Sequence, residues 1–310
     1  MSTKSQSSSP PNPYLSTIKQ KTKRRRQILD FSSSQKRQQV LHTTKSNQKD
    51  KKQPFVFPYG NYAFYYGYRN KGEAQDPRLR LMQRAWFEGR KVLDIGCNSG
   101  ILTIDVAIHF QPSQILGVDI DPSLVRKAER NVQLQYSTLK PPRKCNSAET
   151  ESEDELQVGY FPISMPLLFG TIPLPGENCG FPGNITFRCT DWVENEDEDK
   201  EAFDVVLALS ITKWIHLNKG DTGIKRFFKK AYSVLQPGGM FILEPQLWKT
   251  YAKRSKINQN MTDNYRRTQF YPYQFREYLL NEIGFREMRD LGRPETLSKG
   301  FQRPMELYIK

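Results

Sequence analysis

Short apolar runs alternate with amphipathic stretches through most of the chain beyond residue 90. The runs with the length and aliphatic content of buried strands are 92–95, 115–118, 185–189, 203–210, 240–243 and 305–309. Helical stretches are predicted from about Ile101 and over 227–235. Apolar strands that alternate with helices are typical of a parallel sheet covered by helices on both faces. The pattern therefore predicts an α/β fold.

The predicted strand 92–95 runs directly into a glycine turn. The turn reads Asp94-Ile95-Gly96-Cys97-Asn98-Ser99-Gly100, and Asp119 follows the next apolar run. A strand, a glycine turn, a helix, a second strand and an acid bind a nucleotide-like cofactor at the carboxyl edge of a parallel sheet. The turn lacks the three glycines that bring a pyrophosphate onto a helix N-terminus. S-Adenosylmethionine has no phosphate and carries an ammonium that Asp94 can attract, so it fits this turn better than a dinucleotide does.

Features further along the chain support S-adenosylmethionine. Asp119 is placed to accept hydrogen bonds from both ribose hydroxyls, and Asp191-Trp192 fits the loop that contacts adenine. The usual element order of a class I, Rossmann-like, S-adenosylmethionine-dependent methyltransferase is completed by a strand at 203–210, a helix at 227–235, a turn at 236–239 and a strand at 240–243. We therefore expect a seven-stranded, mostly parallel sheet with helices on both faces.

The net charge of +14 lies mostly near the N-terminus. Residues 1–58 contain thirteen Lys or Arg and two Asp, a net charge of +11, which leaves +3 for the rest of the chain. Residues 1–54 show almost no apolar periodicity, so we expect a disordered basic tail ahead of a methyltransferase domain at 55–310. The basic cluster 21–26 is typical of a nuclear address or an RNA contact. This charge distribution indicates a polyanionic partner, with nucleic acid as the first candidate.

The α/β pattern breaks between about 136 and 184, where prolines recur and acids cluster at 149–155. We expect a disordered surface insertion there, without chemistry. A second acidic run, 194–201, is interpreted as a solvated loop. No apolar run reaches the roughly 20 residues of a membrane span, and the polar N-terminus contains no visible secretory signal. The four cysteines form no zinc-binding spacing, which predicts reduced thiols, an intracellular protein and no metal site.

An aromatic cluster precedes the first predicted strand. Phe55, Phe57 and Phe64 are interpreted as a lid on the core. The other members are Tyr62, Tyr65, Tyr66 and Tyr68, which with Arg69 form a candidate stacking surface with donors for phosphate. Asp76-Pro77 then predicts the start of a helix over 76–87, because Asp and Pro are favoured at the first two positions.

Two polar residues follow the predicted strand 203–210 at the substrate edge of the sheet. Lys213 suits an anionic acceptor, and His216 suits a base or a phosphate ligand; a surface lysine and a structural histidine remain the alternatives. Trp214 is assigned to the core. Residues 248–273 interleave aromatic and basic side chains, which suits single-stranded or looped RNA as well as a helix pair that caps the sheet.

Taken together, these motifs resemble the RNA methylphosphate capping enzymes of the Bicoid-interacting-protein type. The resemblance covers about residues 55–310 apart from the insertion, and its motifs are YGNYAFYYGYRN (59–70), DPRLR (76–80), VLDIGCNSG (92–100), GVDID (117–121), LALSITKWIHLN (207–218), LQPGGMFILEPQLW (235–248) and SKGFQRP (298–304). It implies methylation of the 5′ γ-phosphate of a small non-coding RNA, of which 7SK is the founding substrate. A sister branch methylates 5′-monophosphates, and a mainly non-catalytic RNA-binding scaffold remains a further alternative.

The resemblance also implies site residues. Cofactor contacts fall on Tyr65, Arg78, Gly96, Asn98, Asp119, Ile120 and Leu209, and the turn and the adenine loop add Asp94, Cys97, Asp191 and Trp192. The family pattern has Asn-Tyr where this chain has Asp191-Trp192. The candidates for positioning the acceptor phosphate are Lys213, His216, Arg69 and Tyr66. With the basic cluster, these features lead us to expect a nuclear protein that acts on RNA, within an RNP whose protein partners the sequence does not identify, and no membrane association.

Overall fold

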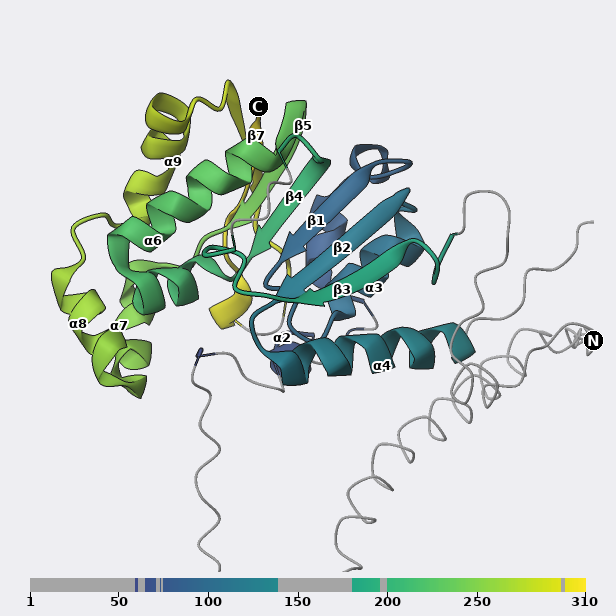
Figure 1. Cartoon of the computed structure of the whole chain (residues 1–310), viewed down its shortest axis with the longest axis horizontal. Helices are drawn as coiled ribbons and strands as arrows, with labels where there is room; N and C mark the ends of the chain where they lie inside the picture. The colour runs from purple at the N-terminus through teal and green to yellow at the C-terminus, as the bar shows by residue number, and fades with distance from the viewer. Residues whose placement is uncertain are drawn as a thin grey trace, which may run out of the picture. The chain divides into compact units, whose positions relative to one another are not determined.

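The computed structural model describes residues 59–60, 65–70, 73, 75–138, 180–195, 200–296 and 299–310. The predicted tail, most of the predicted insertion and the aromatic residues Phe55, Phe57, Tyr62 and Phe64 lie outside the described residues. The fold is built on one seven-stranded sheet in the order β3-β2-β1-β4-β5-β7-β6 (Figure 1). Its strands are β1 (Lys91–Ile95), β2 (Gln114–Asp119), β3 (Ile185–Cys189), β4 (Phe203–Leu209), β5 (Leu235–Glu244), β6 (Glu287–Gly292) and β7 (Met305–Ile309).

Strand β1 lies at the centre of the sheet and pairs in parallel with β2 and β4. Leu93 is the register partner of Leu116 on one side and of Val206 on the other. Strands β3 and β5 extend this parallel set outward, whereas β7 runs antiparallel to both β5 and β6. The expected class I fold, with a seven-stranded and mostly parallel sheet, is confirmed.

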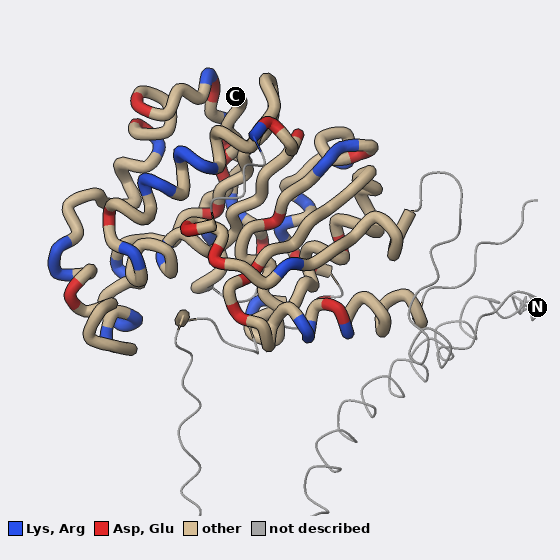
Figure 2. Tube along the Cα trace, viewed as in Figure 1, with Lys and Arg blue, Asp and Glu red and all other residues tan. Residues whose placement is uncertain are grey.

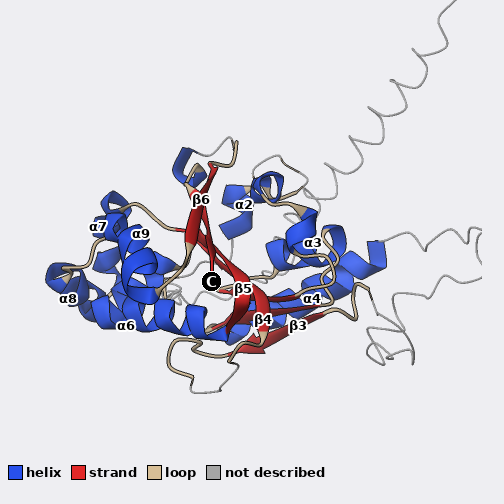
Figure 3. Cartoon of the chain, turned by 90° about the horizontal axis from the view of Figure 1, so that it is seen from above, coloured by secondary structure: helices blue, strands red, loops and turns tan. Residues whose placement is uncertain are grey.

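Helices cover both faces of the sheet (Figure 3). They are α2 (Tyr65–Arg69), α3 (Ile101–His109), α4 (Pro122–Thr138), α6 (Thr212–Val234), α7 (Tyr251–Arg254), α8 (Gln259–Arg267) and α9 (Phe275–Tyr278). Two hydrophobic cores lie on opposite faces of the sheet. Successive residues of β1 pack into one core and then the other, because side chains of a strand alternate between its faces. Val92 packs with α3 residues such as Leu102, and Leu93 packs with α6 residues such as Phe227 and Phe228.

The helix predicted over 76–87 is wrong in type. The chain forms two 3₁₀ turns instead, at Pro77–Leu81 and Arg84–Trp86, with extended backbone at Met82 between them. Asp76 does cap the first turn, as predicted: its carboxylate accepts from the Arg78 backbone N–H at 3.0 Å. The same carboxylate binds the Arg78 guanidinium, and Leu79 and Met82 are buried in the core. These tertiary contacts favour the tight turns over a continuous helix.

Helix α6 begins at Thr212, well before the predicted start at 227. A break at Gly220, with φ of 64° and ψ of −166°, divides it, and the polar residues around this break hide the apolar periodicity. The predicted turn 236–239 forms the start of β5, and β6 had no clear signal in the sequence. Helix α4 continues to Thr138 and residues 180–184 precede β3, so both edges of the predicted insertion belong to the described fold.

After β5, the chain forms a group of short helices and turns that pack next to α6. It consists of α7, α8, α9, 3₁₀ turns at Trp248–Thr250, Ser255–Ile257 and Pro272–Gln274, and a π turn at Leu279–Ile283. The 3₁₀ turn at Lys299–Phe301 lies next to α2, where the Phe301 ring contacts Tyr65. Lys and Arg are frequent along α6, α7 and α8 (Figure 2). Within the described part of the chain, no helix has the length and apolar content to cross a membrane.

Candidate cofactor and acceptor site

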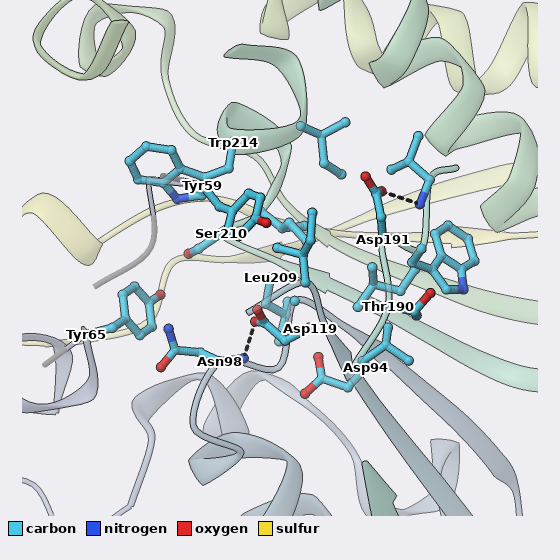
Figure 4. Close-up of a pocket in the computed structure, with 18 of the residues that line it drawn as sticks. Tyr59, Tyr65, Asp94, Asn98, Asp119, Thr190, Asp191, Leu209, Ser210 and Trp214 are labelled. Atoms are coloured by element: carbon cyan, nitrogen blue, oxygen red, sulfur yellow. Dashed lines mark hydrogen bonds between the residues drawn. The ribbon is translucent and has the colours of Figure 1, made fainter. Parts of the chain in front are cut away.

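A cavity of about 300 Å³ lies at the carboxyl ends of the parallel strands. Ligands of open α/β sheets bind at this edge. The walls come from the loops after β1, β2, β3 and β4 and from the segment that precedes β1 (Figure 4). In Figure 4, Tyr65 lies on one side of the cavity and Thr190 and Asp191 lie on the other.

The glycine turn after β1 forms the floor of the cavity. Gly96 has φ of 78°, and a Cβ there would lie 2.3 Å from Ile211 Cδ1, so glycine is required for both conformation and space. Asn98 has φ of 55°, which is unfavourable for a side-chain-bearing residue. Its backbone N–H donates to Asp119 Oδ2 at 2.9 Å, so the turn is held against the end of β2. Such strain is common at ligand sites.

Two buried acids border the turn. Asp119 Oδ1 accepts from the backbone N–H of Asp121 at 3.0 Å, and Asp94 Oδ2 accepts from the Thr103 hydroxyl at 2.6 Å. Burial is the main cause that raises the pKa of each carboxyl to about 6, although these hydrogen bonds oppose the rise. Both acids are therefore mostly ionised at neutral pH, and a ligand with hydroxyl and ammonium donors would stabilise the ionised forms.

The loop after β3 forms the wall opposite Tyr65. Asp191 and Trp192 both line the cavity, as expected for an adenine-contacting loop. Lys219 of α6 pairs with Asp191 at 2.7 Å and with Glu194 at 3.1 Å, which ties this loop to the helix. Glu194 is thus part of a specific ion pair, whereas residues 196–199 of the predicted solvated run lie outside the described residues.

The segment that precedes β1 closes another wall. Tyr59 lines the cavity, and its carbonyl accepts from Asn218 Nδ2 at 3.3 Å. Gly60 packs so closely on Trp214 that a Cβ would lie 2.1 Å from the indole ring. Trp214, which we assigned to the core, is therefore half-buried between this segment and the cavity.

The short helix α2 adds Tyr65 and Tyr66 to the same wall. Burial is the largest influence on Tyr66 and raises the pKa of its phenol well above the usual value, so this hydroxyl stays protonated and able to donate. Tyr68, in contrast, is 61% exposed and lies outside the cavity lining. Of the predicted tyrosine surface, the described structure thus brings two members to the cavity.

Arg69, which we predicted to position the acceptor phosphate, does not line the cavity. It is buried and its Nη2 lies 2.7 Å from Glu244 Oε1 at the end of β5. Arg78 binds the second Glu244 oxygen at 3.2 Å and Asp76 at 2.8 Å. Burial favours protonated acids, but the two guanidinium groups outweigh it and hold the pKa of Asp76 and of Glu244 below their usual values. Because this network neutralises Arg69, direct acceptor binding by Arg69 is not supported.

His216 is also directed away from the cavity. Its ring is buried beside Tyr251 and Phe275, and its Nε2 lies 2.7 Å from Asp221 Oδ1. Asp221 in turn accepts from the backbone N–H groups of Gln269 and Phe270. Burial lowers the pKa of His216 despite the nearby carboxylate. The described contacts therefore give His216 the structural role that the sequence left as an alternative.

Lys213 is buried next to the cavity rather than in its lining. Its Nζ lies 4.9 Å from the centre of the Trp214 ring, and Trp214 itself lines the cavity. Cys97 is buried beneath the turn, where its thiol faces the Asn98 carbonyl at 3.8 Å, so its side chain is not a cavity contact. Burial raises the pKa of this thiol well above its usual value.

The structure brings most of the predicted cofactor residues together. Those that line the cavity are Tyr65, Arg78, Asp94, Gly96, Asn98, Asp119, Ile120, Asp191, Trp192 and Leu209. Further lining residues that sequence reasoning did not assign to the site are Tyr59, Thr190, Ser210, Ile211, Trp214, Asn218 and Lys219. Ser210 directly follows β4 and has φ of 63°, a left-handed conformation that the sequence pattern does not predict.

These residues fit S-adenosylmethionine, which supplies an electrophilic methyl group when bound. Asp119 would accept from ribose hydroxyls and Asp94 would attract the ammonium, because both acids line the cavity beside the glycine turn. Tyr65 and Tyr66 enclose the side of the cavity that faces helix α2. The described lining residues include no histidine.

Comparisons with known proteins identify related methyltransferases. The family described as Bicoid-interacting protein 3 matches residues 203–310, and that of ribosomal protein L11 methyltransferase matches residues 77–154. The human 7SK snRNA methylphosphate capping enzyme is 41% identical, over 84% of this chain and 40% of the human protein. A probable RNA methyltransferase of Arabidopsis thaliana is 40% identical, over 84% of this chain and 83% of its own length.

A further relative has a similarly named activity. The U6 snRNA methylphosphate capping enzyme Amus of Drosophila melanogaster is 38% identical, over 82% of this chain and 75% of the fly protein. The chain spans 42% of the mouse and 40% of the human 7SK capping enzyme that it matches. Since it covers three quarters or more of the fly and plant relatives, the chain belongs to the Bicoid-interacting protein 3 family of methylphosphate capping enzymes and their homologues.

Proposed function

We propose that this protein transfers a methyl group from S-adenosylmethionine to the terminal 5′ phosphate of a small non-coding RNA, with the γ-phosphate of a 5′-triphosphate as the acceptor. Family membership and the cofactor-type cavity support a methyltransferase. Relatives named for 7SK and U6 snRNA support RNA as the substrate class.

The observation that carries the choice of a phosphate acceptor is the similarity to relatives named as methylphosphate capping enzymes. A hydroxyl or amine acceptor has to lose a proton, which calls for a positioned base. A terminal phosphate oxygen is already anionic near neutral pH. The protein then has to orient the acceptor and balance its charge, and proximity supplies much of the rate. The buried pairing of His216 with Asp221 is consistent with this division of labour.

The surface beyond the cavity supports an RNA body as partner. Helices α7 and α8 and the turns beside them expose cations that include Lys249, Lys253, Lys256, Arg266 and Arg267. Trp248 stacks on Tyr265 with 4.7 Å between ring centres. Cations interleaved with aromatic rings attract a phosphate backbone and stack on unpaired bases.

The test uses labelled S-adenosylmethionine and one short hairpin RNA that carries a 5′-triphosphate, a 5′-monophosphate or a 5′-hydroxyl. Label on the triphosphate RNA alone, removable with the terminal phosphate, is the expected result. Label on the monophosphate RNA would assign the protein to the alternative acceptor. Cofactor binding without transfer to any of the three RNAs would contradict the proposal and favour an RNA-binding scaffold.

We also propose a nuclear location and an RNP as the setting of the reaction. The support is the basic cluster Lys21-Thr22-Lys23-Arg24-Arg25-Arg26, which lies outside the described residues, together with relatives named for small nuclear RNAs. Fusion of residues 1–58 to a fluorescent protein tests the address. A diffuse distribution, unchanged when the cluster is replaced by Ser and Gln, would contradict it.

A further inference from the structure

A lysine of helix α6 bridges two acids of the loop that follows β3. Lys219 Nζ lies 2.7 Å from Asp191 Oδ2 and 3.1 Å from Glu194 Oε1. Lys219 and Asp191 both line the cofactor cavity. Burial is the largest single influence on Lys219 and lowers its pKa, but the hydrogen bonds to the two acids and their charges outweigh burial and raise the pKa above its usual value. The lysine therefore stays charged at neutral pH.

A break in helix α6 directly follows this lysine. Gly220 has φ of 64° and ψ of −166°, a backbone conformation that is essentially confined to glycine. A Cβ at this position would have Asn264 Oδ1 as its nearest neighbour, at 3.5 Å, so the glycine is required by conformation and not by space. The break ends the first helical segment of α6 at Lys219, which is the residue that reaches the loop.

The loop after β3 is a turn built around Asp191. The Asp191 carbonyl accepts from the backbone N–H of Glu194 at 3.1 Å and from that of Asn195 at 2.9 Å. Its Oδ1 accepts from the N–H of Val193 at 3.2 Å (Figure 4). These bonds define the shape of the turn, and they direct Oδ1 into the turn and leave Oδ2 for Lys219.

Three cations of α6 attach this turn to the helix. Lys230 Nζ donates to the carbonyl of Trp192 at 2.7 Å, and Arg226 pairs with Glu194. Glu194 lies outside the cavity lining. The Lys219 bridge differs from these contacts because it holds the one carboxylate of the turn that lines the cavity.

We propose that Lys219 is a positioning residue for the cofactor, and that it holds the Asp191 carboxylate in place for the amino group of adenine. The inference concerns cofactor binding and does not depend on which RNA phosphate accepts the methyl group. Each oxygen of a carboxylate can accept more than one hydrogen bond, so Asp191 can accept from adenine while it keeps its present partners. The family pattern has a neutral Asn at this position, which needs no cation. Lys219 is thus the counterpart of the acid by which this chain departs from that pattern.

Binding of S-adenosylhomocysteine, the demethylated cofactor, tests this role without a catalytic step. The full chain is titrated by calorimetry with S-adenosylhomocysteine and with S-inosylhomocysteine, in which an oxo group replaces the amino group of adenine. Lys219→Met removes the charge, and Lys219→Arg keeps it. Lys225→Met is the matched control, because Lys225 is an exposed lysine of the same helix whose Nζ lies 5.0 Å from the centre of the Phe270 ring.

We expect Lys219→Met to weaken S-adenosylhomocysteine binding about fivefold, a size typical of two partly exposed ion pairs. Affinity for S-inosylhomocysteine should change less than about twofold, so the preference for adenine should fall. Lys219→Arg should restore most of the preference, and Lys225→Met should resemble the wild type. An equal loss for both ligands would give Lys219 a merely structural role and overturn the proposal, as would an unchanged preference. Urea unfolding reports the fold of each variant; if Lys219→Met does not fold, Lys219→Gln replaces it with the same expectation.

A second background tests whether Lys219 acts through Asp191. In Asp191→Asn protein, Lys219→Met should change S-adenosylhomocysteine affinity less than about twofold, because a neutral amide needs no cation. A fivefold loss in that background as well would show that Lys219 acts by another route, contrary to the proposal.

Salt provides an independent readout. The Lys219 and Asp191 side chains are 21% and 32% exposed, so salt should screen their pairing. In about 1 M NaCl the S-adenosylhomocysteine affinity of the wild type should approach that of Lys219→Met. An equal response of the two proteins to salt would contradict the role of the bridge. An unchanged adenine preference in Lys219→Met would overturn this inference and leave the proposed RNA methylation intact.

Discussion

Arg69 Nη2 lies 2.7 Å from Glu244 Oε1, so an arginine from the short helix α2 is neutralised by the acid that ends strand β5. The two residues are 175 positions apart in the chain, and both side chains are almost completely buried. The pair therefore fixes the tyrosine-bearing helix α2 to the edge of the sheet. Tyr65, whose hydroxyl accepts from Arg69 at 2.9 Å, is held in the cavity wall by the same contact.

Arg69→Met should lower the free energy of unfolding by about 3–5 kcal/mol, because it removes one of the two arginines that form ion pairs with the buried carboxylate of Glu244. Urea unfolding measures this loss. Arg289→Met is the control, since it removes an exposed arginine that pairs with Glu287, and its midpoint should equal that of the wild type. Equal midpoints for both variants would show that the buried network is not a stabilising element.

Asp119→Asn should weaken S-adenosylhomocysteine binding at least tenfold. The substitution removes the charge. It also places an NH₂ group opposite one of the two backbone N–H groups from which the carboxylate now accepts hydrogen bonds. Calorimetry measures the affinity. Asp290→Asn is a matched control, because Asp290 likewise accepts from the N–H group two residues further on, at Gly292, but far from the cavity. A similar affinity for both variants would remove Asp119 from the cofactor site.

Gly60→Ala should weaken cofactor binding several-fold with little change in unfolding. The backbone has φ of 82°, and the new methyl group would clash with the Trp214 ring, so Tyr59 would leave the cavity wall. Gly67→Ala tests the specificity of this effect, since a Cβ at Gly67 has nothing within 4 Å. Fluorescence titration with S-adenosylhomocysteine compares the two variants, and unchanged binding by Gly60→Ala would show that Tyr59 is dispensable.

Cofactor affinity should fall as the pH drops below about 6. The free carboxyls of Asp94 and Asp119 have pKa values raised to about 6, chiefly by burial, whereas a bound ammonium and ribose would favour the ionised forms. The complex therefore has lower pKa values than the free protein, so binding in acid has to release protons and weakens by up to tenfold per pH unit for each acid. Titrations between pH 5 and 7.5 measure the slope. Constant affinity in protein that circular dichroism shows to be folded would contradict this linkage.

Much of the fold could be read from the sequence because strands buried on both faces are continuous apolar runs. The buried strand at 305–309 was predicted with the bounds that the structure gives it. The edge strand at 185–189 was also predicted with its observed bounds, although most of its residues are not buried. The helix after β4 was predicted only in its second half, since the first half carries polar residues such as Asn218 and Lys219, which line the cavity. The turns over 77–86 could not be predicted, because their form depends on Arg78 reaching Asp76 and Glu244.

The site could be predicted where backbone motifs position it and not where tertiary pairing decides the role of a side chain. The turn residues Gly96 and Asn98 follow from local sequence, and both line the cavity. The roles of Arg69 and His216 depend on Glu244 and Asp221, partners that no spacing in the sequence identifies. Arg303 lies in the motif at 298–304, and that motif does not predict its contact with Ser210 at the cavity wall.

The close packing of Gly60 on Trp214 affects where the protein can be truncated without loss of the cavity. A fragment that starts at the cap residue Asp76 would retain all seven strands, although Glu244 would lose Arg69 as an ion-pair partner. It would nevertheless lack Tyr59, Tyr65 and Tyr66, and with them one side of the cavity. The smallest unit able to enclose a cofactor is therefore longer than the smallest unit able to build the sheet.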